Sequence, residues 1–195
     1  KYGYNLTLTD FSFKKKMYQP TEILAEIQLT ISAGVSAKFI AIGKKALVDL
    51  FKSKKVTLEE IHSKSSENAD EVKFTIGDDF YVDEVLPRFK PTSMYVKLKI
   101  YSLDHLMTLQ HYSRSYVSKK LFDEILSDNL KNYPLPYDKD NCLTAEYTGA
   151  KHLFYEVTEK GEKVAREHIF PYLVQYNESF YDFMARTANR WGEFM

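Results

Sequence analysis

The chain of 195 residues is 44% hydrophobic and 28% charged, which are ordinary values for a globular protein. They exclude a disordered chain and a collagen-like repeat, and no apolar run is long enough for a membrane-spanning helix. The 27 basic and 27 acidic residues cancel, whereas a general binder of nucleic acids or anionic membranes carries a positive excess. Tyr, Phe and Trp make up 15% of the chain, which favours β-sheets and protein–protein interfaces.

The N-terminal half of the chain contains mainly segments that predict strands. Residues 71–76 and 80–82 flank Gly77-Asp78-Asp79, and two β-rich runs around such a tripeptide predict a hairpin. A short helix is expected over residues 43–51. Strands separated by turns favour a small barrel or a sandwich. Three further segments alternate apolar and polar residues, as strands with one buried face do: 4–9, 23–31 and 95–101.

After about residue 115 the pattern changes to helices mixed with short strands. One helix is expected from an N-cap at Ser118 until the prolines of residues 132–137 end it. A last helix is expected after a strand over 171–176, with Asn177 or Ser179 as its N-cap. Apolar residues recur at helical spacing in both helices, namely Leu121, Phe122, Ile125, Leu126 and Leu130, then Phe180, Phe183, Met184 and Thr187.

The segment between these two helices is less regular. Residues 142–147 predict a short strand, and Gly161 predicts a turn in a charged stretch. The whole pattern indicates an α+β, β-rich fold. We expect a small β-barrel in residues 1–115, followed by a mixed helix and strand module in residues 116–195.

No combination of residues carries the chemistry of an enzyme. The five histidines include no pair at i, i+4 spacing, and Cys142 is the single cysteine, so neither a zinc site nor an intrachain disulfide is predicted. Residues 138–141 lack the glycine and the distal glutamate of a calcium loop. Phosphate-binding loops, dinucleotide fingerprints and nucleophile elbows are absent. We therefore expect no enzyme and no catalytic, cofactor-binding or metal-ligating residues.

One basic and aromatic cluster stands near the N-terminus. Lysines 14–16 lie close in sequence to Phe11, Phe13 and Tyr18. A platform for nucleic acid needs the rings on one face with cations beside them. The alternative, which we favour, is a solvated edge strand or loop, where lysines discourage unwanted pairing.

The last part of the chain carries a motif at fixed offsets. Residues 171–192 resemble the signature of VgrG, the spike protein of type VI secretion, and of the related tail-hub proteins of contractile phages. Phe180 departs from this signature, which usually has Asp there, and residues 187–191 replace an acidic run. The positions that match are Gln175, Tyr176, Glu178, Ser179, Phe183, Arg186 and Gly192.

A weaker match lies upstream. Residues 101–106, 112–116 and 119–121 look like the passage from first barrel to helix in that family. The resemblance therefore covers residues 95–195, while residues 1–94 are similar only in their pattern.

The signature also makes physical sense as architecture. Ser179 and Glu178 are placed to satisfy free N–H groups at the start of the last helix. Glu178 and Asp182 would lie at its positive end. Phe183 would pack the helix on a sheet, and Arg186 one turn later can reach back to an acidic partner.

The resemblance implies a structural role. Members of the family build a homotrimeric hub whose barrels dock on a hexameric, Hcp-like tube ring and work with baseplate components and secreted effectors. The resemblance implies assembly in the bacterial cytoplasm, followed by secretion or injection into a target cell. No window of the sequence resembles a signal peptide or a membrane-spanning segment, and we expect no cofactor and no nucleic acid partner.

The resemblance also implies how the chain divides. Residues 1–115 would be the first hub β-barrel and residues 116–195 the helix-containing start of the second module, which would be incomplete. Because the chain begins at Lys1 and stops on hydrophobic residues, we expect a fragment of a longer hub. Two alternatives stay open: the hub of a phage tail or extracellular injection device, and a monomeric carbohydrate- or protein-binding module that uses exposed tyrosines and Trp191.

Overall fold

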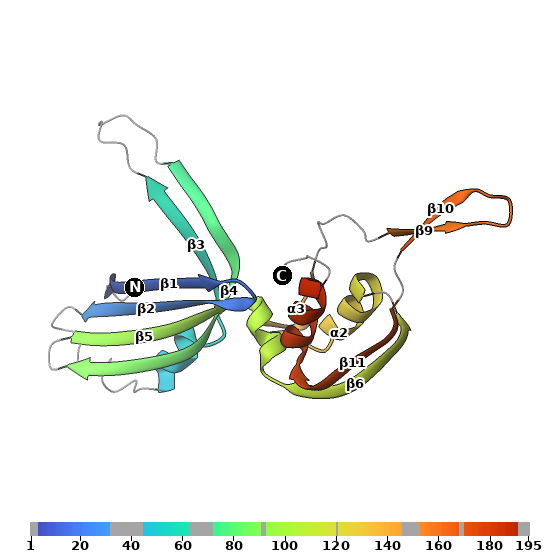
Figure 1. The fold of residues 1–195 in the computed structure, drawn as a ribbon. Helices are drawn as coiled ribbons and strands as arrows, with labels where there is room; N and C mark the ends of the chain where they lie inside the picture. The colour runs from blue at the N-terminus through green and yellow to red at the C-terminus, as the bar shows by residue number, and fades with distance from the viewer. Residues whose placement is uncertain are drawn as a thin grey trace. The chain divides into compact units, whose positions relative to one another are not determined.

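A computed structural model describes residues 4–31, 45–62, 72–90, 93–119, 121–145, 153–167 and 170–190 (Figure 1). The chain divides into two compact units, residues 1–103 and 104–195. This division falls before the change of pattern near residue 115, because β6 packs within the second unit. The fold is β-rich with a few helices, which confirms the predicted α+β class.

The first unit is built on one curled antiparallel sheet that resembles half of a barrel (Figure 1). Its strands follow the order β1-β2-β5-β4-β3, so β1 and β3 are the edges in the described part of the chain. The lysines of residues 14–16 thus lie on an edge strand, as the sequence predicted. The five strands are β1 (Tyr4–Lys16), β2 (Gln19–Ile31), β3 (Lys55–His62), β4 (Val72–Lys90) and β5 (Ser93–Ser102).

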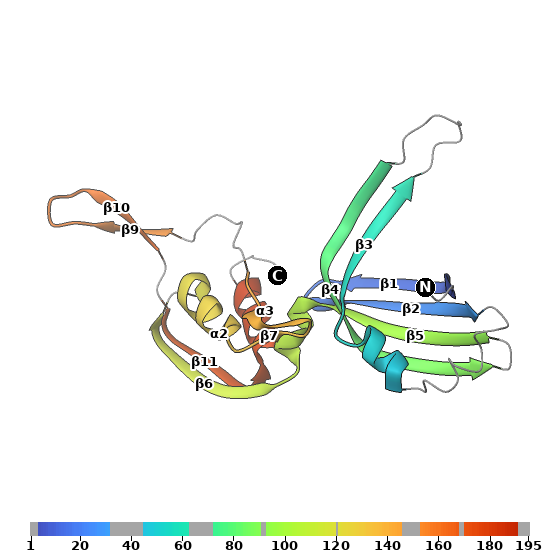
Figure 2. The same cartoon turned by 180° about the vertical axis from the view of Figure 1, so that it is seen from behind.

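The core of the first unit lies on one face of this sheet. Residues of β5 are alternately buried and half-buried along most of the strand, which confirms the strand predicted from the alternation of apolar and polar residues over 95–101. A short helix at residues 45–51 packs on the core through Leu47, with Val48 and Phe51 against it, and Figure 2 places it beside the β4–β5 side of the sheet. The strand residues of the core are Ile23, Ala25 and Leu29 of β2, Phe80, Val82 and Val85 of β4, and Met94, Val96, Leu98 and Ile100 of β5.

The hairpin predicted at Gly77-Asp78-Asp79 is wrong. β4 runs without a turn from Val72 to Lys90, and its register with β3 shifts beside Gly77 instead. A Cβ atom on Gly77 would lie 2.7 Å from Cε2 of the Phe80 ring. Gly77 therefore lies at an irregularity of the strand, where the Phe80 ring packs close to the backbone. Besides turns, such irregularities are a common place for glycine in a strand.

Two β-bulges keep apolar residues on one face where the sequence spacing would divide them. Leu8 pairs with Ile27 while Asp10 pairs with Glu26, so Thr9 is an extra residue in β1. The Thr9 hydroxyl donates to the Glu26 carbonyl at 3.0 Å, which secures the bulge. Asp83 plays the same part in β4, between the buried Val82 and Val85.

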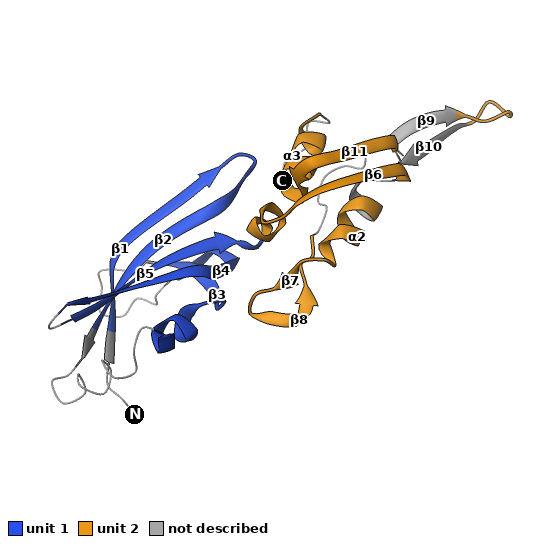
Figure 3. Ribbon diagram, turned by 90° about the horizontal axis from the view of Figure 1, so that it is seen from below, with its two compact units in different colours: residues 1–103 blue, residues 104–195 orange. Residues whose placement is uncertain are grey.

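The described residues of the second unit, orange in Figure 3, form three two-stranded sheets and short helices. Its largest sheet pairs β6 with β11, and α3 begins directly after β11. The elements are the 3₁₀ helix η1 (Leu103–Thr108), β6 (His111–Lys119), the π-helix η2 (Leu121–Leu126), α2 (Ser127–Leu130), β7 (Pro134–Leu135), β8 (Asp138–Cys142), β9 (Leu153–Val157), β10 (Lys163–Glu167), β11 (Phe170–Ser179) and α3 (Phe180–Arg190).

The structure confirms the strand over 171–176, the last helix and the turn at Gly161, and it corrects two other predictions for this unit. Gly161, with φ of 78°, lies in the turn between β9 and β10. The expected helix after Ser118 exists as η2 and α2, but Ser118 is not its cap, since it belongs to β6 with φ of 51°. The strand expected over 142–147 is placed too late, because β8 ends at Cys142; residues 146–147 lie outside the described part.

Candidate functional site

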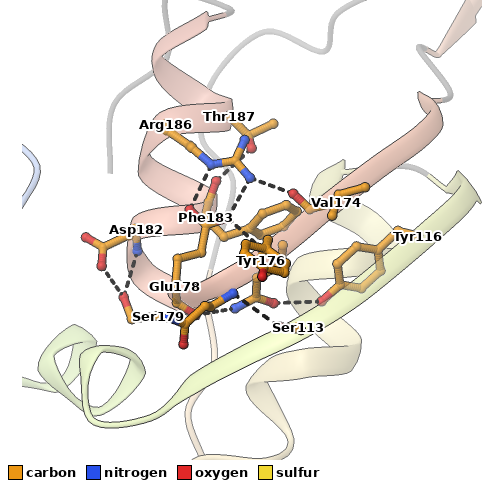
Figure 4. Close-up of polar contacts among 12 residues, drawn as sticks. Ser113, Tyr116, Val174, Tyr176, Glu178, Ser179, Asp182, Phe183, Arg186 and Thr187 are labelled. Carbon is orange, nitrogen blue, oxygen red and sulfur yellow. Dashed lines mark hydrogen bonds and ion pairs between the residues drawn. The ribbon is translucent and has the colours of Figure 1, made fainter.

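The signature residues meet where β11 ends and α3 begins. We call this set the junction and define it as Gln175, Glu178, Ser179, Phe183 and Arg186. Figure 4 labels the last four of these residues. Two of the five come from α3 and three from the end of β11. Because strand and helix follow each other without a loop, side chains from both elements converge on one small volume.

An ion pair between Glu178 and Arg186 closes the junction. The guanidinium donates from Nε to Oε2 at 2.8 Å and from Nη2 to Oε1 at 2.6 Å, a fork that matches the carboxylate (Figure 4). Nη2 also donates to the Val174 carbonyl at 2.6 Å. Arg186 thereby ties the first turns of α3 back to the strand before it. Its hydrogen bonds, with help from the Tyr176 N–H, lower the pKa of Glu178 below its usual value, although partial burial opposes them.

Ser179 is the N-cap of α3. Its Oγ accepts the Asp182 N–H at 3.0 Å and donates to Asp182 Oδ2 at 2.7 Å. One of the free N–H groups of the first turn is thus satisfied, and a carboxylate lies at the positive end of the helix. The sequence offered Asn177 or Ser179 as caps, and the structure selects Ser179.

Gln175 is fully buried and holds the turn between strand and helix. Its Nε2 donates to the Glu178 carbonyl at 3.0 Å, and its Oε1 accepts from the Tyr116 hydroxyl at 3.4 Å. Between Gln175 and Glu178 the strand forms a bulge, in which Asn177 adopts a left-handed backbone with φ of 46°. The Asn177 N–H donates to Ser113 Oγ on β6 at 3.2 Å, so this bulge is fastened to the neighbouring strand.

Aromatic rings pack beneath the junction. Phe183 is completely buried, and its ring lies 5.4 Å from that of Tyr116 and 6.1 Å from that of Phe180. Phe180 in turn stacks on Tyr133 at 6.2 Å between centroids. Phe180 departs from the family signature, and here it fills the space between Tyr133 and Phe183. Burial raises the pKa of the Tyr133 hydroxyl to about 12.

A second polar link was not predicted from the sequence. Arg114 on β6 donates to Asn129 Oδ1, and Asn129 Nδ2 donates to the Ile125 carbonyl at 2.7 Å. Asn129 is buried, although asparagine is uncommon inside a helix core. In the sequence, the only sign of this link is an asparagine at the end of an apolar helix. Its partner Arg114 lies on β6, so spacing along the chain does not indicate the contact.

Five of the seven signature positions therefore act together. Tyr176 contributes only through its backbone N–H, which donates to Glu178 Oε1 at 3.4 Å, while the residue is 78% exposed. Gly192 lies outside the described residues. Phe183 packs α3 on the sheet and Arg186 reaches back to an acidic partner, as the residue types predicted.

The polar side chains of the junction are engaged in contacts within the chain. Both oxygens of its carboxylate already accept hydrogen bonds from Arg186. In the described part of the chain, no group of three or more His, Cys, Asp or Glu side chains is placed to hold a metal ion. Cys142 lies half-buried, with its thiol 3.2 Å from the Lys131 carbonyl. Among the described helices, none is both long and apolar enough to cross a membrane.

No family model matches the chain, and no curated protein matches it.

Proposed function

We propose that the chain is a structural component of the spike or hub of a contractile injection machine, similar to VgrG of type VI secretion. In this role, copies of the chain form a trimer that docks on a hexameric, Hcp-like tube ring and carries effectors forward. The role is mechanical, and the protein would be made in the bacterial cytoplasm before it is secreted or injected.

One observation supports this proposal most. The residues that match the family signature are not scattered in space, because Gln175, Glu178, Ser179 and Arg186 bind one another or the same short backbone segment. Fixed spacing is expected when each residue depends on the position of the others. The strand end, the helix cap and the returning arginine form one cluster, as a signature that specifies a strand–helix junction would require.

The curled sheet of the first unit is a second support. A half-barrel whose outer strands β1 and β3 each pair with one neighbour among the described strands suits a subunit that is completed by assembly, and abundant Tyr and Phe suit the surfaces of such an assembly. Balanced charge leaves little repulsion between copies.

The test is binding to a tube. The purified chain is mixed with hexameric rings of the tube protein encoded in the same genome, and the complex is measured by sedimentation and electron microscopy. We expect three chains for each ring. In the producing cell, deletion of the gene should abolish secretion of the tube protein. Intact secretion after deletion, together with no binding to rings, would reject the proposal.

Variants of α3 sharpen this experiment. Arg186→Ala removes the fork to Glu178 and should lower both tube binding and secretion. Arg190→Ala changes an exposed arginine of the same helix and is the matched control, which should keep both.

A monomeric binding module is the second candidate. Tyr172 and Tyr176 favour it, since both are strongly exposed on β11. This candidate predicts a strict monomer that binds glycans or peptides, and Tyr172→Ala with Tyr176→Ala would abolish that binding. A trimer that binds the tube would reject it.

A further inference from the structure

A half-buried arginine lies on the face of the β6–β11 sheet that α2 and α3 cover. Both helices lie on the same side of this sheet in Figures 1 and 2. Arg114 of β6 extends toward α2, where its Nη1 donates to Asn129 Oδ1. The ring of Tyr112 lies against the guanidinium, with 4.1 Å between the ring centroid and Cζ. Among the described residues, no carboxylate contacts Arg114, although the residue is half-buried.

Arg186 of the same unit shows how a comparable arginine is satisfied. Its side chain is 36% exposed, and Glu178 neutralises it through the fork of hydrogen bonds at the junction. Arg114 meets only the neutral oxygen of Asn129 and the face of a tyrosine ring. A guanidinium carries more N–H donors than one neutral oxygen can use. Because a partly desolvated charge is costly without an opposite charge, the surroundings of Arg114 favour an anion.

A buried hydroxyl close to this guanidinium is also unused. Tyr133 is only 6% exposed, and its hydroxyl makes no hydrogen bond in the part of the chain that the structure describes. The rest of the residue is fixed, since its N–H donates to the Leu130 carbonyl and its ring stacks on Phe180. Buried tyrosine hydroxyls normally find a hydrogen-bond partner. Tyr133 therefore holds a spare donor in a defined place.

The electrostatics put Tyr133 near Arg114. Burial raises the pKa of the Tyr133 hydroxyl to about 12, with help from Tyr112 and Tyr116, while the Arg114 guanidinium lowers it. A charge affects a pKa in this way only when it lies nearby. The hydroxyl stays protonated at neutral pH, so it is available to donate.

The groups left over in this cluster are donors. The hydroxyls of Tyr112 and Tyr116 already donate to side-chain oxygens within the chain. Asn129 Oδ1 already accepts from Arg114. What remains is the other edge of the guanidinium, formed by Nε and Nη2, together with the Tyr133 hydroxyl. Donors gathered around one positive charge fit an acceptor that carries negative charge.

We propose that Arg114 and Tyr133 form a binding site for an oxyanion, namely a carboxylate or phosphate group. The parallel N–H groups of Nε and Nη2 match two oxygens of such a group, and the Tyr133 hydroxyl adds a donor from another element. Asn129 and the Tyr112 ring hold the guanidinium in orientation. The inference does not rest on the proposed function, since nothing in it requires copies of the chain to associate.

The experiment is an NMR titration of the full chain with sodium phosphate and, separately, with sodium acetate. Sodium chloride keeps the ionic strength constant, so that screening does not change during the titration. The Nε–H resonance of Arg114, assigned by its loss in Arg114→Lys, should shift and saturate with one ion for each chain. The Nε–H resonance of Arg186 is the internal control and should move little, because it already donates to Glu178.

The two ions distinguish the sources of the oxyanion. Saturation with phosphate alone identifies a phosphate group, and saturation with acetate alone identifies a carboxylate. Saturation with both supports the shared chemistry. If neither ion saturates the Arg114 resonance, the proposal is overturned.

Variants then locate the site, with the backbone amides of residues 112–116 and 129–133 as reporters. Arg114→Gln removes the charge and should abolish the saturable shifts. Tyr133→Phe keeps the stacked ring and removes only the hydroxyl, so it should weaken binding about tenfold while the melting temperature stays at or above that of the wild type. Arg190→Gln changes an exposed arginine of α3 and is the matched control, which should bind like the wild type.

The Tyr133→Phe result decides the proposal even where Arg114→Gln does not fold. A purely structural tyrosine would leave the affinity unchanged after loss of its hydroxyl, and that outcome would overturn the proposal. A folded Arg114→Gln variant that still binds either ion at wild-type strength would overturn it as well.

Discussion

Asn177 lies in the bulge near the end of β11, and its backbone is left-handed, with φ of 46°. Asparagine tolerates this region, whereas a β-branched residue does not. We predict that Asn177→Gly changes the free energy of unfolding by less than about 1 kcal/mol, while Asn177→Val lowers it by about 1–2 kcal/mol. Urea unfolding of both variants measures this. Equal stability of the two would mean that the strand–helix transition relaxes to another backbone shape.

Glu178 gives the junction a dependence on pH. Because its pKa in the folded protein is lowered, its contribution to stability is complete above the unfolded-state pKa near 4.5 and is lost as pH falls through the folded value. Glu178→Gln should cost about 1 kcal/mol at pH 7, since Arg186 is partly exposed to solvent. As the pH is lowered from 5, the urea midpoint of this variant should therefore fall less than that of the wild type.

The control for this pH series is Asp128→Asn. Asp128 pairs with Lys131 at 3.1 Å on the surface, where both side chains are largely exposed. This variant should stay within about 0.5 kcal/mol of wild type at pH 7. If Glu178→Gln retained the full acid dependence of wild type, the titrating carboxylate would lie elsewhere.

Among the elements, β4 depends on a glycine for its shape. A Cβ atom at residue 77 would lie 2.7 Å from one atom of the Phe80 ring and 3.1 Å from the next. The ring is buried, so Gly77→Ala should destabilise the first unit by about 1–3 kcal/mol through overpacking. Thermal unfolding measures the loss. In a Phe80→Leu background the added cost of Gly77→Ala should shrink, and an undiminished cost would point to the backbone rather than to the ring.

Elements with strict alternation or helical spacing could be predicted from the sequence. β2, β5 and α3 are such elements, because burial of one face alone decides their pattern. The long β4 could not be predicted, since Gly77-Asp78-Asp79 has the composition of a turn, and only the pairing of β4 with β3 shows that the strand continues there with a shifted register. Local composition does not reveal that pairing.

The junction was predictable in part for the same reason. The cap by Ser179 and the return of Arg186 involve residues within 12 positions of each other, so spacing indicates them. The contact between Gln175 and Tyr116 spans 59 positions and depends on the pairing of β6 with β11. That pairing is a product of the whole fold, and no motif in either strand specifies it.

For the molecule as a whole, two units imply two separate cores. The core cluster of the first unit contains no residue beyond Ile100, and Phe183 belongs to the second unit. Phe183→Ala should cost about 3–5 kcal/mol because it leaves a cavity in a fully buried place. Hydrogen exchange should then speed up in β6, β11 and α3 while β2 and β5 keep their protection.

The reciprocal variant completes this prediction. Val96 is fully buried in β5, and Val96→Ala should speed up exchange in the first unit alone. Faster exchange in both units from either variant would mean that the chain unfolds as one cooperative body.

Thr9 makes β1 unusual in how it would respond to changes of chain length. In a regular strand, one inserted or deleted residue reverses the phase of everything beyond it, so that inward and outward side chains exchange places. Here one surplus residue is already accommodated, with Leu6 and Leu8 before it and Phe11 and Phe13 after it in phase. Deleting Thr9 would leave an unbroken two-residue period. β1 is therefore a strand in which descendants of this protein can differ in length by one residue without turning the sheet inside out.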